Sequence, residues 1–136
     1  MIKASLAHAG VMAALHGAVF PEDPWDEANF AALFQQNGVS GLLDPRGGFV
    51  LFWLVADEAS VITLGVVPKR QGIGRALLAA GLQQMREAGA VMIYLEVAAT
   101  NMAARKLYEG FGFQQTGLRK KYYTDGDDAV TMSLGL

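Results

Sequence analysis

The chain is predicted to be an α/β protein built on a mixed sheet, and three parts of its 136-residue sequence indicate this class. Apolar residues at helical spacing dominate the first 36 positions. Residues 39–67 then form apolar runs separated by turn residues, which is typical of a meander of strands. Beyond residue 72, helix and strand patterns alternate, as expected where helices cover a sheet.

Length and composition narrow the class of protein further. A chain of this length is expected to be one domain spanning 1–136. The net charge of -2 arises from mixed acidic and basic residues, so it gives no argument for a nucleic acid or a membrane as partner. The absence of cysteine excludes disulfides, thiolate nucleophiles and thiolate metal sites, and no metal is expected.

Two features of the sequence favour a cytoplasmic protein. The start, Met1–Ser5, lacks the pattern of a signal peptide. The longest apolar run, 49–56, is far shorter than the roughly 20 residues that cross a bilayer. We therefore expect a cytoplasmic protein, either a monomer or a homodimer.

The first 36 residues predict a short edge strand at 2–5 and two helices. The first helix, at 8–19, is expected to bury one apolar face, made of Val11, Leu15, Ala18 and Val19. Asp23 followed by Pro24 predicts an N-cap and a first helical position for the second helix, which would run to Gln36. Its apolar anchors are Trp25, Phe30, Leu33 and Phe34.

Three strands are predicted in the middle of the chain, at 39–43, 48–56 and 59–67. Turn-forming residues 44–47 separate the first two, and 57–58 is expected at the tip of a tight hairpin. The last two strands are apolar on both faces. This pattern fits the centre of a sheet that is covered on each side.

A glycine-rich turn follows these strands and leads straight into a helix. The first-turn N–H groups of a helix lack intrahelical partners and carry partial positive charge, so a strand, a glycine turn and a helix start together make an anion site. Gly72 and Gly74 would let a phosphate approach the main chain. Positive side chains surround them, namely Lys69, Arg70 and Arg75. Neither the dinucleotide fingerprint nor the P-loop matches, because Leu77 replaces the third glycine and no Lys-Ser or Lys-Thr pair follows.

The remaining elements are helix, strand, helix and a strand pair. The helix after the turn has one apolar stripe and ends at Gly89; the stripe is Ile73, Leu77, Leu78, Leu82 and Met85. A strand is predicted at 91–97. Asn101 opens the last helix, whose apolar face holds Ala104, Leu107, Tyr108 and Phe111. The final strands are expected at 113–118 and 129–134.

Several polar residues are candidates for a functional site, each with a plainer interpretation. Glu96 interrupts an apolar strand, so its carboxylate lies either on a solvated face or in a cleft. Tyr108 belongs to a core stripe, although its hydroxyl can reach a cleft while its ring packs in the core. Asn101 is most simply a helix cap. His8 and His16 have no partner at metal-ligand spacing and are interpreted as structural or exposed.

Three sequence blocks resemble the GCN5-related N-acetyltransferase (GNAT) superfamily. Its pyrophosphate signature, [QR]-x-x-G-x-[GA], is read here as Lys69-Arg70-Gln71-Gly72-Ile73-Gly74. Residues 94–113 resemble its L-E-V…N…A…LY…GF segment. Residues 119–132 resemble the R-x-x-Y-Y…D-A…M ending of its ribosomal-protein-alanine N-acetyltransferase branch. Two departures occur: Lys69 stands where Gln or Arg is usual, and the loop after Pro68 is about two residues shorter than the family pattern.

The resemblance implies a fold and an activity. The fold is a largely antiparallel mixed sheet with splayed central strands, flanked by about four helices. The activity is transfer of acetyl from acetyl-CoA to a primary amine, by direct attack in a ternary complex. A protein N-terminal residue of the alanine type is the expected acceptor. A small amine such as an amino acid or polyamine, and a CoA-binding regulatory protein without turnover, are the alternatives.

The resemblance also implies residue roles. Glu96 would accept the ammonium proton, directly or through water, and Tyr108 would protonate the departing CoA thiolate. The residues expected to bind the cofactor are Leu64, Gly65, Val66, Lys69, Arg70, Gln71, Gly72, Ile73, Gly74, Arg75 and Asn101. Among these, the Val66 N–H would face the thioester oxygen. Residues 119–123 either shape the acceptor cleft or form a hydrated hairpin.

Overall fold

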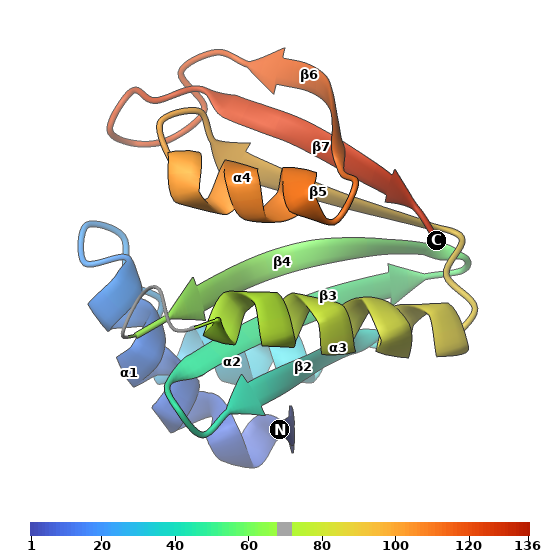
Figure 1. The fold of residues 1–136 in the computed structure, drawn as a ribbon. Coiled ribbons are helices and arrows are strands. Elements are labelled where there is room, and N and C mark those ends of the chain that lie inside the picture. Colours follow the sequence, from blue (N-terminus) through green and yellow to red (C-terminus); the bar gives the residue numbers. More distant parts are fainter. Residues whose placement is uncertain (68–71) are drawn as a thin grey trace.

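A computed structural model describes residues 1–67 and 72–136 (Figure 1). It holds a seven-stranded sheet of order β1-β2-β3-β4-β5-β7-β6, in which β4 and β5 pair in parallel and the other neighbours are antiparallel. The strands are β1 (Ile2–Ala4), β2 (Val39–Asp44), β3 (Gly48–Val55), β4 (Glu58–Val66), β5 (Met92–Ala98), β6 (Gln114–Arg119) and β7 (Ala129–Gly135). The prediction of a mixed, largely antiparallel sheet is confirmed.

Helices cover the two faces of this sheet unequally. They are α1 (Ala9–Val19), preceded by a 3-10 turn η1 (Leu6–His8), then α2 (Glu27–Phe34), α3 (Ile73–Glu87) and α4 (Met102–Gly110). In Figure 1, α3 and α4 lie in front of the sheet, whereas α1 and α2 lie behind its β2–β4 half. No helix in the described ranges is long and apolar enough to cross a membrane.

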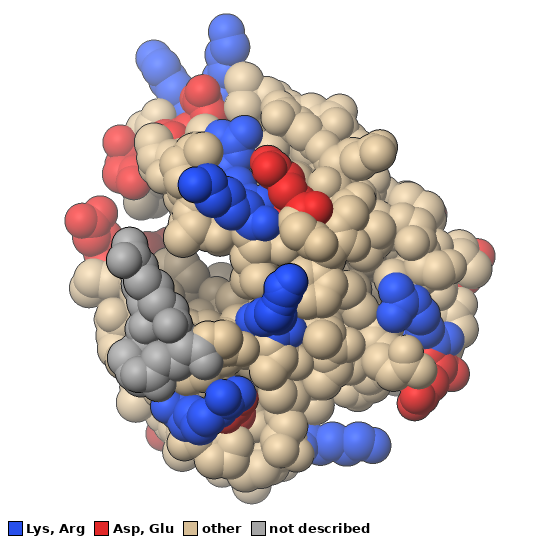
Figure 2. Space-filling view, in the orientation of Figure 1, with Lys and Arg blue, Asp and Glu red and all other residues tan. Residues whose placement is uncertain are grey.

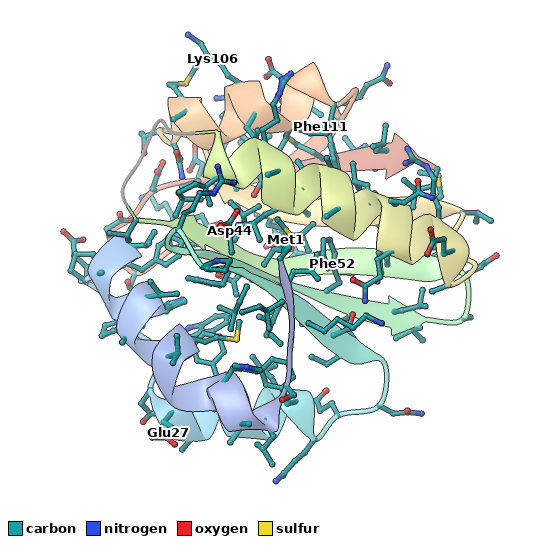
Figure 3. All side chains as sticks on the ribbon, turned by 60° about the horizontal axis from the view of Figure 1, so that its bottom comes forward. Met1, Glu27, Asp44, Phe52, Lys106 and Phe111 are labelled. Atoms are coloured by element: carbon teal, nitrogen blue, oxygen red, sulfur yellow. The ribbon has the colours of Figure 1, made fainter. Side chains whose placement is uncertain are left out.

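Two separate cores hold these layers together. The larger core lies between the sheet and the helices α3 and α4; Phe52 of β3 points into it and packs against Gly81 of α3 (Figure 3). The predicted stripe of α3 is confirmed, since all five of its apolar residues are buried: Ile73, Leu77, Leu78, Leu82 and Met85. The smaller core joins α1 and α2 to Phe49 and Leu51 of β3.

The central strands separate over most of their length. β4 pairs with β5 only from Glu58 opposite Met92 to Ser60 opposite Tyr94. Beyond Ser60, β4 continues to Val66 while the two strands diverge (Figure 1). A β-bulge between Leu51 and Phe52 in the β3–β4 ladder adds local twist at the same level. The splayed central strands implied by the resemblance are therefore present.

Two predictions about the N-terminal helices are wrong. The buried face of α1 is formed by Ala9, Met12 and His16, whereas Val11 is 55% exposed. The helical period of the sequence does not determine which of the two apolar faces of α1 packs against the sheet. Here the aromatic cluster beneath α1 selects the His16 side, where the imidazole finds a hydrogen-bond partner.

The second helix starts later than predicted, at Glu27, because Asp26 rather than Asp23 is its N-cap. The Asp26 carboxylate accepts the Asn29 N–H at 2.8 Å, and the Asn29 side chain accepts the Asp26 N–H at 3.0 Å. This reciprocal capping box satisfies two backbone donors at once. The helix also ends earlier, at Phe34 instead of Gln36.

Candidate active site

Two clefts meet where β4 and β5 diverge. One, of about 490 Å³, is named here the splay cleft; it is lined by α1, the α1–α2 segment, β4, β5, α4 and the loop after β6. The other, of about 700 Å³, is named the face cleft; it is lined by the α1–α2 segment, β4–β7 and the loop after β6. Figure 2 shows the front surface hollowed at the level of this divergence. Both clefts share Asp23, Trp25, Val61, Ile62, Glu96, Tyr123 and Thr124.

Glu96 lies at this junction. Strand alternation turns its neighbours Leu95 and Val97 into the larger core, so the carboxylate points to the opposite face of β5. Its side chain is 32% exposed, and its Oε1 lies 3.6 Å from Nη1 of Arg119. That separation is an ion pair rather than a hydrogen bond. The carboxylate is thus partly shielded from water yet open to both clefts.

Tyr108 occupies the splay-cleft side of the junction. The residue is 6% exposed, and its ring packs edge-to-face on Phe113 with centroids 5.7 Å apart. Burial, with a smaller contribution from Tyr123, raises the pKa of Tyr108 to about 12. The phenol therefore keeps its proton at neutral pH and can donate it. Tyr108 is therefore both a core residue and a residue that lines the splay cleft.

Tyr123 bridges the two clefts, which the sequence left undecided. Burial, then the negative charge of Glu96, raises the pKa of Tyr123 to about 12. Arg119 and Tyr122 also line the face cleft, and the guanidinium of Arg119 lies 5.4 Å from the Tyr122 ring centroid. Lys120 and Lys121 stay exposed. Segment 119–123 thus contributes three residues to the clefts and two to the hydrated surface.

The loop after β6 is fastened to the loop after β5. The Thr100 hydroxyl donates to the Asp127 carboxylate, and the Ala99 N–H donates to the Asp128 carbonyl at 2.9 Å. The hydrogen bond from Thr100 lowers the pKa of Asp127. The Tyr123 N–H donates to the Asp127 carbonyl at 3.2 Å. These contacts hold Tyr123 beside Glu96, and no local sequence pattern indicated them.

The edge of β4 presents main-chain groups to the splay. The Val67 N–H donates across to the Gly47 carbonyl at 2.6 Å. Because successive residues of a strand point their N–H groups to opposite sides, those of Leu64 and Val66 point toward the space left by β5. Gly65 points toward β3 instead, and a Cβ there would come 2.8 Å from the Phe49 ring. Gly65 is therefore required by packing, whereas Leu64 and Val66 present backbone polar groups.

The glycine turn leads into α3 as expected. Gly72 caps the helix in the left-handed conformation, with φ +72°, and the space beside its Cα is open. The Ile73 side chain is fully buried, so that residue presents only its main chain. A Cβ at Gly74 would meet Leu107 at 3.3 Å, so this glycine also lets α3 approach α4. The expected contacts of Lys69, Arg70 and Gln71 lie outside the described residues.

Arg75 and Asn101 are the last two of the predicted cofactor-binding residues. The guanidinium of Arg75 lies over the Phe111 ring, 5.7 Å from its centroid, at the α3–α4 boundary. Asn101 caps α4, because its side-chain oxygen accepts the Ala104 N–H at 3.2 Å. Asn101 also lines the splay cleft, so it can cap α4 and still contact a ligand in that cleft.

Comparison with known proteins gives a consistent result. The model of the family described as "Acetyltransferase (GNAT) family" matches residues 13–113. The [ribosomal protein bS18]-alanine N-acetyltransferase of Escherichia coli K12 is 38% identical over 119 residues, which cover 82% of this chain and 80% of the relative.

Solved structures agree with this match. The crystal structure of the ribosomal-protein-S18-alanine N-acetyltransferase from Escherichia coli superposes with a TM-score of 0.85 at 32% identity, covering 98% of this chain and 92% of that one. A structure of yncA from Salmonella typhimurium with its cofactor acetyl-CoA shares the fold, with a TM-score of 0.81 at 21% identity over 99% and 92% of the chains.

Proposed function

This chain belongs to the acetyltransferase (GNAT) family and is an acyltransferase, and on that premise we propose that it acetylates the N-terminal amine of a protein that begins with alanine or a similar residue. The acceptor class follows from the bS18-alanine N-acetyltransferases, which match over most of both chains. We further propose that residues 1–136 act as one acetyltransferase domain. The observation that supports the activity is the position of Glu96, where the splay cleft meets the face cleft.

Acetyl-CoA is assigned to the splay cleft. Its pantetheine amides would pair with the main chain of Leu64 and Val66, which faces the gap beside β4. The pyrophosphate would lie against the N-terminus of α3 at Gly72, where first-turn N–H groups without intrahelical partners and the helix dipole favour an anion. Asn101, at the start of α4, would contact the pantetheine arm or the acetyl end.

The acceptor amine is assigned to the face cleft, and the reaction follows from the residues at the junction. Glu96 accepts a proton from the α-ammonium, directly or through water, which frees the nitrogen lone pair. The nitrogen attacks the thioester carbonyl carbon; a C–N bond forms, and the Val66 N–H stabilises the oxyanion. The C–S bond then breaks, and the Tyr108 hydroxyl gives its proton to the CoA thiolate. The nitrogen of the new amide still carries a surplus proton, which it loses through water to the Tyr108 phenolate, so that the phenol is restored.

The test is an acetylation assay with purified protein. Acetyl-CoA is mixed with a peptide that begins with alanine, and CoA release and peptide mass are both measured. We expect CoA release together with a mass gain of one acetyl group at the peptide N-terminus. The same peptide with a blocked N-terminus is the control and should release no CoA.

Other outcomes of this assay identify the alternatives. CoA release with amino acids or polyamines, but not with peptides, would indicate a small-amine acetyltransferase. A thermal shift with acetyl-CoA but no release across all amines would indicate a regulatory CoA-binding protein. The presence of both Glu96 and Tyr108 at the clefts argues against that last outcome.

A further inference from the structure

His16 and Trp25 form a hydrogen-bonded and stacked pair beside the clefts, yet proton transfer needs neither of them. His16 lies on α1 with 3% of its surface exposed. Its Nδ1 accepts the backbone N–H of Trp25 at 3.1 Å. The two rings stack with centroids 4.5 Å apart and planes 15° apart. One imidazole thus fixes both the backbone and the side chain of Trp25.

The surroundings of His16 hold it in turn. Three phenylalanine rings lie within 6.0 Å of its centroid: Phe20, Phe30 and Phe49. Burial lowers the pKa of His16, while the nearby charge of Asp23 opposes that change. The neutral ring, with its hydrogen on Nε2, suits the acceptor role of Nδ1. The segment between α1 and α2 is therefore anchored near its end, one residue before the Asp26 cap of α2.

Trp25 itself lies where the two clefts meet, in the same lining as Glu96 and Tyr123. An acceptor amine must reach this junction to give its proton to Glu96 and meet the thioester. The carbon that bears the amine, with its side chain, must then lie within a few ångströms of the same place. A fixed indole there removes volume that a large side chain would need.

We propose that Trp25 limits the size of the side chain on the amine-bearing carbon of the acceptor, and that His16 is the positioning residue that holds Trp25. The acceptors selected are α-amines with a small side chain or none. This inference rests on the proposed function, since it assigns the face cleft to the acceptor.

The test uses peptides that differ only in the first residue, from glycine and alanine to leucine and phenylalanine. For Trp25→Ala we expect the leucine-to-alanine ratio of kcat/KM to rise about 10-fold or more, as for a pocket enlarged by several methylenes. Trp25→Phe should give a smaller rise and carries less risk of misfolding. Trp53→Ala is the matched control, because Trp53 lies on β3, is 42% exposed, donates to the Asn37 carbonyl and lines neither cleft.

The positioning role is tested at His16. His16→Leu removes the acceptor for the Trp25 N–H, and we expect it to raise the KM for peptide and the leucine-to-alanine ratio of kcat/KM. His16→Asn places an amide oxygen near the Nδ1 position and should restore part of the selectivity. His8→Asn is the control, since His8 caps the adjacent turn through Ser5 and lines neither cleft. A purely structural role would lower the melting temperature and kcat for all peptides without changing the ratio.

The outcomes separate the two proposals. If the wild type acetylates the alanine peptide and Trp25→Ala and Trp25→Phe keep its selectivity, the inference is overturned and the proposed function stands. If the wild type acetylates no peptide in the series, the proposed function fails and the inference fails with it.

Discussion

The two halves of the sheet are built differently. Strands β2 to β4 lie between α3 on one face and α1 with α2 on the other (Figure 1). Consequently, four successive residues of β3, 49–52, are all fully buried. Strands β5 to β7 carry α4 on one face, and β5 accordingly alternates between buried Leu95 and exposed Tyr94.

This difference explains where the chemistry can take place. A carboxylate on a strand covered on both faces would lose its hydration and would need a buried partner. On β5 the Glu96 carboxylate faces a cleft instead and forms a loose ion pair with Arg119. β4 and β5 also diverge at this level. The β5–β7 half, which has a helix on one face, can therefore hold the charged Glu96 carboxylate next to main-chain groups of β4 that do not pair with β5. The comparison predicts that changes in the β5 half affect turnover, and changes in the β2–β4 half affect stability.

The largest effect is expected from Glu96→Gln, which should lower kcat about 10³-fold, because the amine then has no positioned base. Activity should partly recover between about pH 7 and 9, as the α-amine, with a pKa near 8, deprotonates without help. The measurement is CoA release against pH with an alanine peptide. Glu58→Gln, at the exposed start of β4, is the control. A variant that retains full activity at pH 7 would falsify the role of Glu96.

Tyr108→Phe should lower kcat about 10²-fold. The effect is smaller because a thiolate with a pKa near 8.5 leaves tolerably well without a proton. Since burial raises the pKa of Tyr108 to about 12, the wild-type rate should show no loss near pH 10 from this phenol. A pH–rate profile of both proteins checks this. An alkaline limb near pH 10 that disappears in the variant would contradict the assignment of a buried, protonated donor.

In the doubly covered half, Gly81→Ala should destabilise the protein by about 1–3 kcal/mol with kcat little changed. A Cβ at Gly81 would overlap the Phe52 ring, which β3 holds against α3 (Figure 3). Gly110→Ala is the matched control in α4, where the added methyl meets open space. Urea unfolding of both variants measures the difference. Equal stabilities would show that the core of this half is less tightly packed than the structure indicates.

The smallest effect concerns acid stability at the turn between β2 and β3. Hydrogen bonds from Arg46 lower the pKa of Asp44 from 3.8 to about 2. The carboxylate therefore contributes stability above pH 4, and this contribution is lost as the pH falls toward 2. We expect the difference in unfolding free energy between wild type and Asp44→Asn to shrink over that range. A difference that stays constant from pH 5 to pH 2 would exclude this linkage.

Much of the fold follows from local patterns. The strands of the meander, the buried stripe of α3 and the Asn101 cap were all predictable, because alternation, helical period and capping act between neighbours in the sequence. The hairpin tip was misplaced by one residue: Glu58 pairs with Val55, and Ala56 takes the left-handed conformation with φ 54°. A non-glycine residue in that conformation gives no sequence signal.

The candidate site was only partly predictable. Glu96 and Tyr108 were predicted from the resemblance to the GNAT family. The match of the family model over residues 13–113 confirms membership of that family, whereas the roles of the two residues stay predictions. Trp25 was interpreted only as a helix anchor, and His16 as structural or exposed. An aromatic residue just before a helix cap is the signal that could have marked Trp25, but it fits a core position equally well.

The sequence by itself determined the order of elements, the glycine turn into α3 and the family, since each depends on residues close together in the chain. Only the tertiary structure decided which face of α1 is buried and which side chains meet at the junction. Residues 16, 25, 96 and 123 come from four separate segments. Their meeting depends on the divergence of β4 from β5 and on the packing of α1 against the sheet, which are long-range contacts that no local period encodes.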